Sequence, residues 1–199
     1  MKTLIISLLV FTFQPESMSN TGHQPCIVFD ERSYFTKSDC IEDSVIALDE
    51  LRLLYLEAFQ QEEKAGKMLH FFKSKTRKSP VEEAYHGAFY ALSALHKKMP
   101  VKRLSLVKKA KKHLKKAVKS APEQIEIRFL RFSLNHYLPD LFKNEKMLQE
   151  DQAQLLKLFR SLEETQQEPE LLQIIAGFML SSQRCTEEEN RVYQRYLNK

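Results

Sequence analysis

Apolar side chains recur at three- and four-residue steps along most of this chain, the spacing of one face of an α-helix. The clearest case spans residues 104–120, and its apolar face consists of Leu106, Val107, Ala110, Leu114, Ala117, Val118 and the following Ala121. The opposite face carries Lys108, Lys109, Lys111, Lys112, Lys115, Lys116 and Lys119. Pro122 is predicted to end this helix, because proline lacks an amide hydrogen and clashes with the preceding turn.

A second helix is predicted from about Glu123 to Leu138, where apolar residues occur on nearly every side. Such a pattern is typical of a helix packed between neighbours. We therefore expect the helices of residues 104–120 and 123–138 to form the centre of an all-helical stack.

The same spacing predicts helices over residues 44–74, 80–97 and 145–162, with a break in the first near Gly66. Pro80 and Pro169 suit the first turn of a helix, where the missing amide hydrogen has no consequence. Thr186 and Glu189 have the spacing of a capping box, which predicts a last helix after Thr186. Residues 44–199 are thus predicted to form one all-α domain.

The N-terminus resembles a secretory signal. A basic start at Lys2 precedes the apolar run 4–13, and Ser17 and Ser19 follow with the −3 and −1 spacing of a cleavage site. The run is shorter than the roughly 20 residues that span a bilayer. We expect residues 1–19 to be a signal peptide cleaved near Ser19 and the protein to be periplasmic or extracellular. The alternative is an N-terminal core helix.

Residues 20–43 are predicted to be irregular, and they contain two of the chain's three cysteines. In an oxidising compartment Cys26 and Cys40 could form a disulfide, which leaves Cys185 unpaired. The alternative is three free thiols in a reducing compartment. The cysteines and histidines lack the spacing of a zinc site, so neither a metal nor another cofactor is expected.

Charge is distributed unevenly along the 199 residues, whose formal net charge is +5. Residues 84–122 contain eleven Lys or Arg and no Asp or Glu. Such asymmetry indicates either an anionic partner or a solvated lysine face. No hydrolase, phosphate-loop or dinucleotide-binding motif occurs, and no nucleophile with a positioned base can be identified. We therefore expect a protein that is not an enzyme.

The central helices resemble tetratricopeptide repeats (TPRs). The second-helix pattern A-x3-F-x2-A-x4-P is matched, with Leu in place of Phe, by Ala110, Leu114, Ala117 and Pro122. The first-helix spacing is matched, with Phe89 where the family has glycine, by Tyr85, Ala88, Phe89 and Leu92. About eleven extra residues separate the two halves, and the resemblance covers about residues 50–138. The whole chain also resembles small exported bacterial proteins of unknown role, which share its Arg-Cys-Thr-Glu-Glu-Glu segment.

The TPR resemblance implies helical hairpins stacked as a short superhelix whose concave groove binds a protein or peptide. The residues expected to line this groove are Tyr85, His86, Phe89, Arg128, Arg131 and Asn135. The alternative for the two arginines is internal pairing with carboxylates such as Glu82, Glu83 or Glu126.

The main functional hypothesis is an exported scaffold for a protein or peptide partner. The alternative is binding of an anionic surface, a membrane lipid or a nucleic acid, through the lysines of residues 104–120. Further cations extend that patch: Lys97, Lys98, Lys102 and Arg103. A nucleic acid is disfavoured as the partner, because no aromatic residue is interleaved with these lysines to stack on bases.

Overall fold

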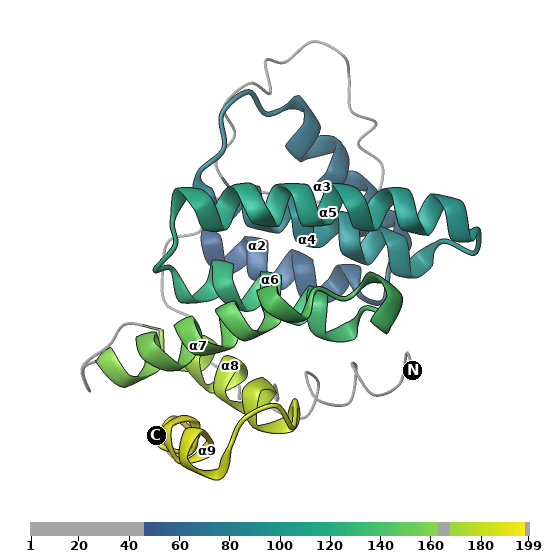
Figure 1. Cartoon of the computed structure of the whole chain (residues 1–199). Coiled ribbons are helices and arrows are strands. Elements are labelled where there is room, and N and C mark those ends of the chain that lie inside the picture. The colour runs from purple at the N-terminus through teal and green to yellow at the C-terminus, as the bar shows by residue number, and fades with distance from the viewer. Residues whose placement is uncertain (1–45, 163–167, 198–199) are drawn as a thin grey trace, which may run out of the picture. The chain divides into compact units, whose positions relative to one another are not determined.

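The computed structural model describes residues 46–162 and 168–197, and within these ranges the chain is all-helical without strands (Figure 1). This confirms the predicted all-α class. The elements are α2 Leu48–Ala58, α3 Glu62–Ser74, α4 Pro80–His96, α5 Pro100–Ser120, α6 Ile125–Tyr137, the 3-10 turn η1 Asp140–Phe142, α7 Glu145–Ser161, α8 Pro169–Ser181 and α9 Glu187–Gln194. The predicted signal peptide, the irregular segment 20–43 and the pair Cys26 and Cys40 lie outside the described residues.

Local capping chemistry sets several helix starts where the sequence predicts them. The Thr186 hydroxyl accepts from the Glu189 amide at 3.3 Å, and the Glu189 carboxylate accepts from the Thr186 amide at 2.9 Å. Ser79 and Glu82 form the same reciprocal pair ahead of Pro80. Each box satisfies amides that the first helical turn would otherwise leave without partners.

Two predicted boundaries are wrong. The helix expected over residues 44–74 breaks at residues 59–61, while Gly66 lies inside α3. The helix expected to begin at residue 104 begins at Pro100, because proline is well suited to a first helical position.

The most enclosed helix is α4, which packs against α2, α3, α5 and α6. Eleven of its 17 residues are buried, whereas α5 buries only the stripe of Ala110, Leu114, Ala117 and Val118. The expectation that α5 and α6 form the centre is therefore wrong for α5, whereas α6 packs against α4, α5 and α7. A helix with a full lysine face must leave that face in solvent, so it cannot be surrounded on all sides.

A glycine allows α4 and α5 to approach each other closely. A Cβ atom at Gly87 would lie 2.9 Å from Leu114 Cγ, 3.0 Å from the Ala110 carbonyl oxygen and 3.1 Å from His113 Cβ. The backbone oxygen cannot move aside without disturbing α5, so the position has no room for a methyl group.

Gly87→Ala is expected to lower the free energy of unfolding by about 1–2 kcal/mol, because overpacking outweighs the gain in helix propensity. Denaturant titration measures this change. Gly66→Ala is the matched control, since no atom of the described residues lies within 4 Å of a Cβ there. It should raise stability by about 0.5–1 kcal/mol. A stabilised Gly87→Ala protein would contradict the close helix contact.

Two hydrophobic clusters meet at α6. One unites α2 to α5 with Ile127 and Leu130 of α6, and the other unites α7 to α9 with Phe132 of α6.

In the described part of the chain, no helix has both the length and the apolar character that a bilayer span requires.

Candidate functional surface

The residues predicted to line a groove from α4 lie in the core instead. Phe89 is fully buried, Tyr85 is 3% exposed and His86 is 4% exposed. Both nitrogens of His86 are buried and have no hydrogen-bond partner among the described residues, and its ring stacks between Phe72 and Tyr90. These three side chains therefore cannot contact a partner on the surface, and this part of the prediction is wrong.

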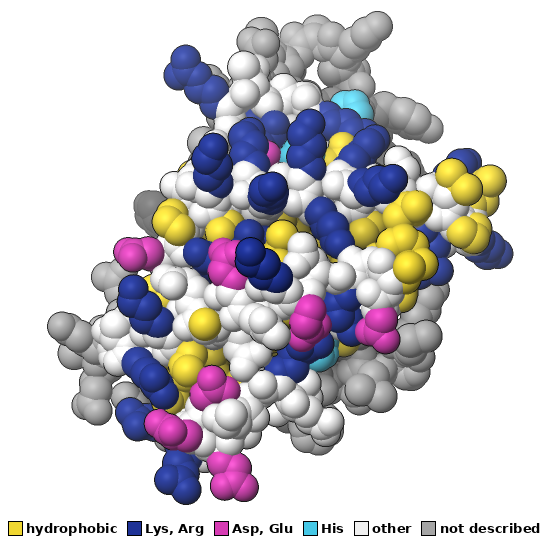
Figure 2. Space-filling model, in the orientation of Figure 1, with side chains coloured by type: hydrophobic (Ala, Val, Ile, Leu, Met, Phe, Trp, Pro, Cys, Tyr) yellow, Lys and Arg dark blue, Asp and Glu magenta, His cyan; other side chains and the backbone are white. Residues whose placement is uncertain are grey.

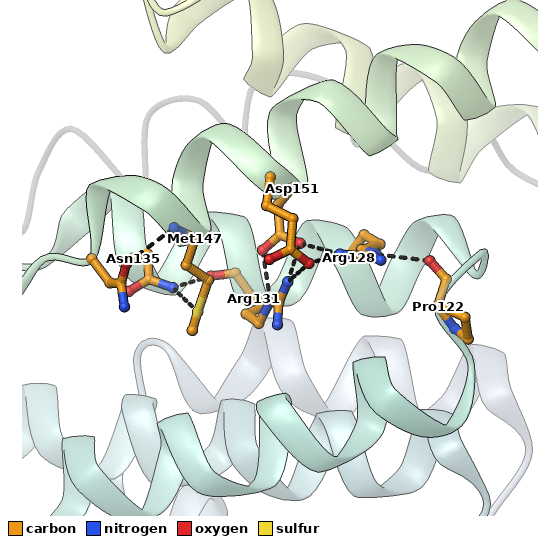
Figure 3. Close-up of polar contacts among 8 residues, drawn as sticks. Pro122, Arg128, Arg131, Asn135, Met147 and Asp151 are labelled. Carbon is orange, nitrogen blue, oxygen red and sulfur yellow. Dashed lines mark hydrogen bonds and ion pairs between the residues drawn. The ribbon is translucent and has the colours of Figure 1, made fainter.

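The groove residues predicted on α6, Arg128, Arg131 and Asn135, are buried as well, at the contact with α7 (Figure 3). Arg131 donates from Nε to Asp151 Oδ2 at 2.7 Å and from Nη2 to Asp151 Oδ1 at 2.6 Å. Arg128 donates from Nη1 to Asp151 Oδ1 at 2.9 Å and from Nε to the Pro122 carbonyl oxygen at 2.7 Å.

Glu150, at the edge of the same network, accepts from Arg128 at 2.8 Å and from Arg131 at 3.0 Å. Its pKa is lowered, chiefly by the hydrogen bond from Arg128. Burial alone would lower the pKa of Arg131, but its hydrogen bonds and charge attraction to Asp151 and Glu150 raise it overall. The alternative of internal pairing is thus confirmed for both arginines, although the partners are not the predicted Glu82, Glu83 and Glu126.

Asn135 completes the contact between α6 and α7. Its amide Nδ2 donates to the Arg131 carbonyl oxygen and to Met147 Sδ, both at 3.2 Å (Figure 3). The arginines and Asn135 therefore join two helices, and the prediction that they face a groove is wrong. The fully buried carboxylate of Asp151 pairs with both arginines from the facing helix, and Met147 of the same helix accepts from Asn135.

A second buried carboxylate, Glu126, joins α2 and α4 to α6. It accepts from Arg52 Nε at 2.8 Å, from Arg52 Nη2 at 2.9 Å and from the Tyr85 hydroxyl at 2.6 Å. Burial, followed by the charge of Glu126, raises the pKa of Tyr85, and the Glu126 hydrogen bond raises the pKa of Arg52. Arg52 also donates to Glu168, the residue before α8, at 2.7 Å. This network is structural, since its atoms are already paired within the fold.

The predicted lysine face does lie on the surface of α5. Figure 2 shows Lys and Arg side chains spread over this helix with few acidic side chains between them. Six of the seven lysines are exposed, and the other, Lys111, is half-buried and donates to the Phe142 carbonyl oxygen of η1. Lys116 pairs with Glu83 at 3.2 Å. Among the described residues no ion pair is formed by Lys108, Lys109, Lys112, Lys115 or Lys119.

An aromatic cluster missed by the sequence reasoning lies beneath these lysines. The ammonium groups of Lys109 and Lys73 lie 5.6 Å and 6.0 Å from the centroid of the Tyr90 ring. His113 of α5 is half-buried and stacks on the Tyr90 ring. The tyrosine is 5% exposed, so its ring contacts cations but cannot stack on a nucleic-acid base. Tyr90 follows His86 by four residues, and this helical spacing was the signal in the sequence for the cluster.

Potential chemical sites are sparse in the described residues. His86 and His113 have ring centroids 4.1 Å apart, yet His113 Nδ1 bonds to Glu83 at 2.9 Å. No group of three or more His, Cys, Asp or Glu side chains is placed to hold a metal ion within residues 46–162 and 168–197. Cys185 is half-buried, and burial raises the pKa of its thiol to about 11.

Comparisons with protein-family models, with curated proteins and with solved structures find no match to this chain.

Proposed function

We propose that this protein is a non-enzymatic binding protein whose lysine face on α5 docks against an anionic surface. The single observation that supports this is the row of exposed lysines without internal ion pairs in the described residues. Lys108, Lys112, Lys115 and Lys119 follow one another at four- and three-residue steps, so they form one stripe along the helix.

Uncompensated like charges along one helix face repel one another, which disfavours the isolated fold slightly. An anionic surface relieves that repulsion, and each lysine near it contributes about 1 kcal/mol at physiological ionic strength. A protein or peptide groove is less well supported, because all six residues expected to line it are buried. We also propose a TPR-like superhelix. We further propose export with cleavage near Ser19, and this part rests on residues outside the described ranges.

Lys112→Gln/Lys115→Gln is expected to weaken binding to a polyanion about tenfold to thirtyfold, because two of these contributions are lost. Binding to heparin and to vesicles of phosphatidylglycerol in phosphatidylcholine is measured at several salt concentrations. The wild-type affinity should fall steeply with salt.

The matched control is Lys146→Gln/Lys157→Gln, which removes the same charge from exposed positions on α7. It should change binding by less than about threefold, since net charge alone acts weakly through screened solvent. Equal losses in the two variants, or no binding to either polyanion, would overturn the proposal.

A further inference from the structure

One side of the molecule combines exposed apolar side chains with cations that form no ion pair within residues 46–162 and 168–197. Met99, in the turn between α4 and α5, is 55% exposed, and Val101, in the first turn of α5, is 78% exposed. On η1, Leu141 is 86% exposed and Phe142 is 38% exposed. Large apolar side chains this exposed and gathered on one side indicate a contact surface, whereas singly scattered ones are ordinary.

The two segments lie on the same side of the fold in Figure 1. The Lys111 ammonium of α5 donates to the Phe142 carbonyl oxygen, which fixes η1 against α5. In Figure 1 the α4–α5 turn projects from the molecule on the side where the chain passes from α6 to α7. Figure 2 shows hydrophobic side chains gathered on that side. We name this surface, formed by Met99, Val101, Leu141 and Phe142, the apolar tip.

Cations flank the α4–α5 part of the apolar tip, whereas at η1 the exposed Asp140 pairs with Lys143 at 2.9 Å. Lys98, Lys102 and Arg103 are exposed next to Met99 and Val101, and no ion pair within the described residues neutralises them. No acidic residue occurs from position 84 to 122. The lysine face continues from these residues along the same helix, so one positive surface extends from the tip over α5.

We propose that the apolar tip inserts into the interfacial region of an anionic lipid bilayer, with the flanking cations on the lipid head groups. This inference rests on the proposed function and specifies its anionic surface. A projecting turn suits a bilayer, because apolar side chains can enter the boundary between head groups and acyl chains without a preformed pocket. Charge complementarity selects anionic lipids, and the burial of Tyr90 removes the stacking ring that a single-stranded nucleic acid would need.

The chain contains no tryptophan, so a single introduced indole reports on its own position. With phosphatidylglycerol-containing vesicles, V101W and L141W are expected to shift their emission to shorter wavelength and to be quenched by lipids brominated on the acyl chains. L53W is the matched control, because Leu53 is an exposed apolar residue on α2 and is 52% exposed. Its emission should stay unchanged.

Val101→Asp/Leu141→Asp should weaken sedimentation with these vesicles about tenfold or more, since two aliphatic side chains lose their burial. Heparin binding should be unchanged within about threefold, because the lysines remain. The control Leu53→Asp should change neither the sedimentation with vesicles nor the binding to heparin.

The outcomes separate the two proposals. Indoles at 101 and 141 that stay in water while the protein sediments with vesicles would overturn insertion and leave the lysine face standing. A wild-type protein that binds heparin but not vesicles would likewise overturn insertion and leave the lysine face standing. If the wild-type protein binds neither heparin nor these vesicles, both proposals are overturned. A dimer that Val101→Asp converts to a monomer, measured by light scattering, would identify a second copy as the occupant and overturn insertion.

Discussion

Asp151→Asn is expected to lower the free energy of unfolding by about 3–5 kcal/mol, the largest loss we predict for a single side chain. The carboxylate is fully buried and receives three hydrogen bonds from Arg128 and Arg131. Asparagine has a similar shape but no charge, so two buried guanidinium groups would lose their main counter-charge. The cost comes from these uncompensated charges more than from the lost bonds themselves.

Urea titration followed by far-ultraviolet circular dichroism measures this change. Glu150→Gln is the matched control, because it alters the neighbouring carboxylate of the same network but at a side chain that is 55% exposed. Water replaces its bonds, and the expected cost is below about 1 kcal/mol.

A second variant distinguishes the charge effect from loss of packing. Arg128→Leu/Arg131→Met/Asp151→Leu removes the network and leaves no buried charge at the contact between α6 and α7, so it should cost much less than Asp151→Asn alone. If Asp151→Asn instead costs no more than Glu150→Gln, the network does not hold α6 to α7.

Helix positions were largely predictable from sequence because their causes are local. The capping box at Thr186, the prolines at 80 and 169, and the apolar spacing of each helix act within a few residues. The break between α2 and α3 was misplaced, because glycine in a helix costs only about 1 kcal/mol and packing of α3 outweighs it. Gly66 was therefore a weak signal.

The position of Arg128 and Arg131 was not predictable from their own helix. Arginines on an apolar helix indicate either an anionic ligand or a buried counter-charge, and the deciding residue lies on another element. Asp151 did give a signal, since it lies three residues after Leu148 and four before Leu155 on the apolar face of α7. A carboxylate on a core-facing stripe requires a cationic partner nearby.

The exposure of the lysine face was predictable for the opposite reason. Seven lysines cannot be buried without counter-charges, and residues 84–122 contain no acidic residue. The apolar tip, in contrast, depends on the turn between α4 and α5 lying on the same side of the fold as η1. This juxtaposition arises from tertiary packing, and neither segment has a periodic pattern that would reveal it.

His86 makes the stability of the fold depend on pH. Burial above all, and then the positive charges of His113, Lys78 and Lys73, lower its pKa from 6.5 to about 4, although Glu83 acts in the opposite direction. Between these two pH values the unfolded chain binds a proton that the folded chain does not. The stabilisation is thus fully present above pH 6.5 and is lost as the pH falls toward 4.

His86→Phe should remove this dependence. The phenyl ring can occupy the stack between Phe72 and Tyr90, whose centroids lie 5.4 Å and 5.0 Å from that of the imidazole. At neutral pH the variant should be more stable by about 1 kcal/mol, because two buried nitrogens without partners are gone. On acidification to about pH 4.5, the wild type should lose about 2–3 kcal/mol more than the variant.

Unfolding free energies of both proteins, measured by denaturant titration across this range, give the difference directly. Carboxylates titrate in the same range, but they are common to both proteins and cancel in the comparison. His70→Gln controls for histidine removal as such, because His70 is exposed on α3. Parallel pH profiles for His86→Phe and the wild type would show that His86 takes up a proton in the folded state as readily as in the unfolded chain. Its burial beneath the lysine face would then not be the source of acid sensitivity.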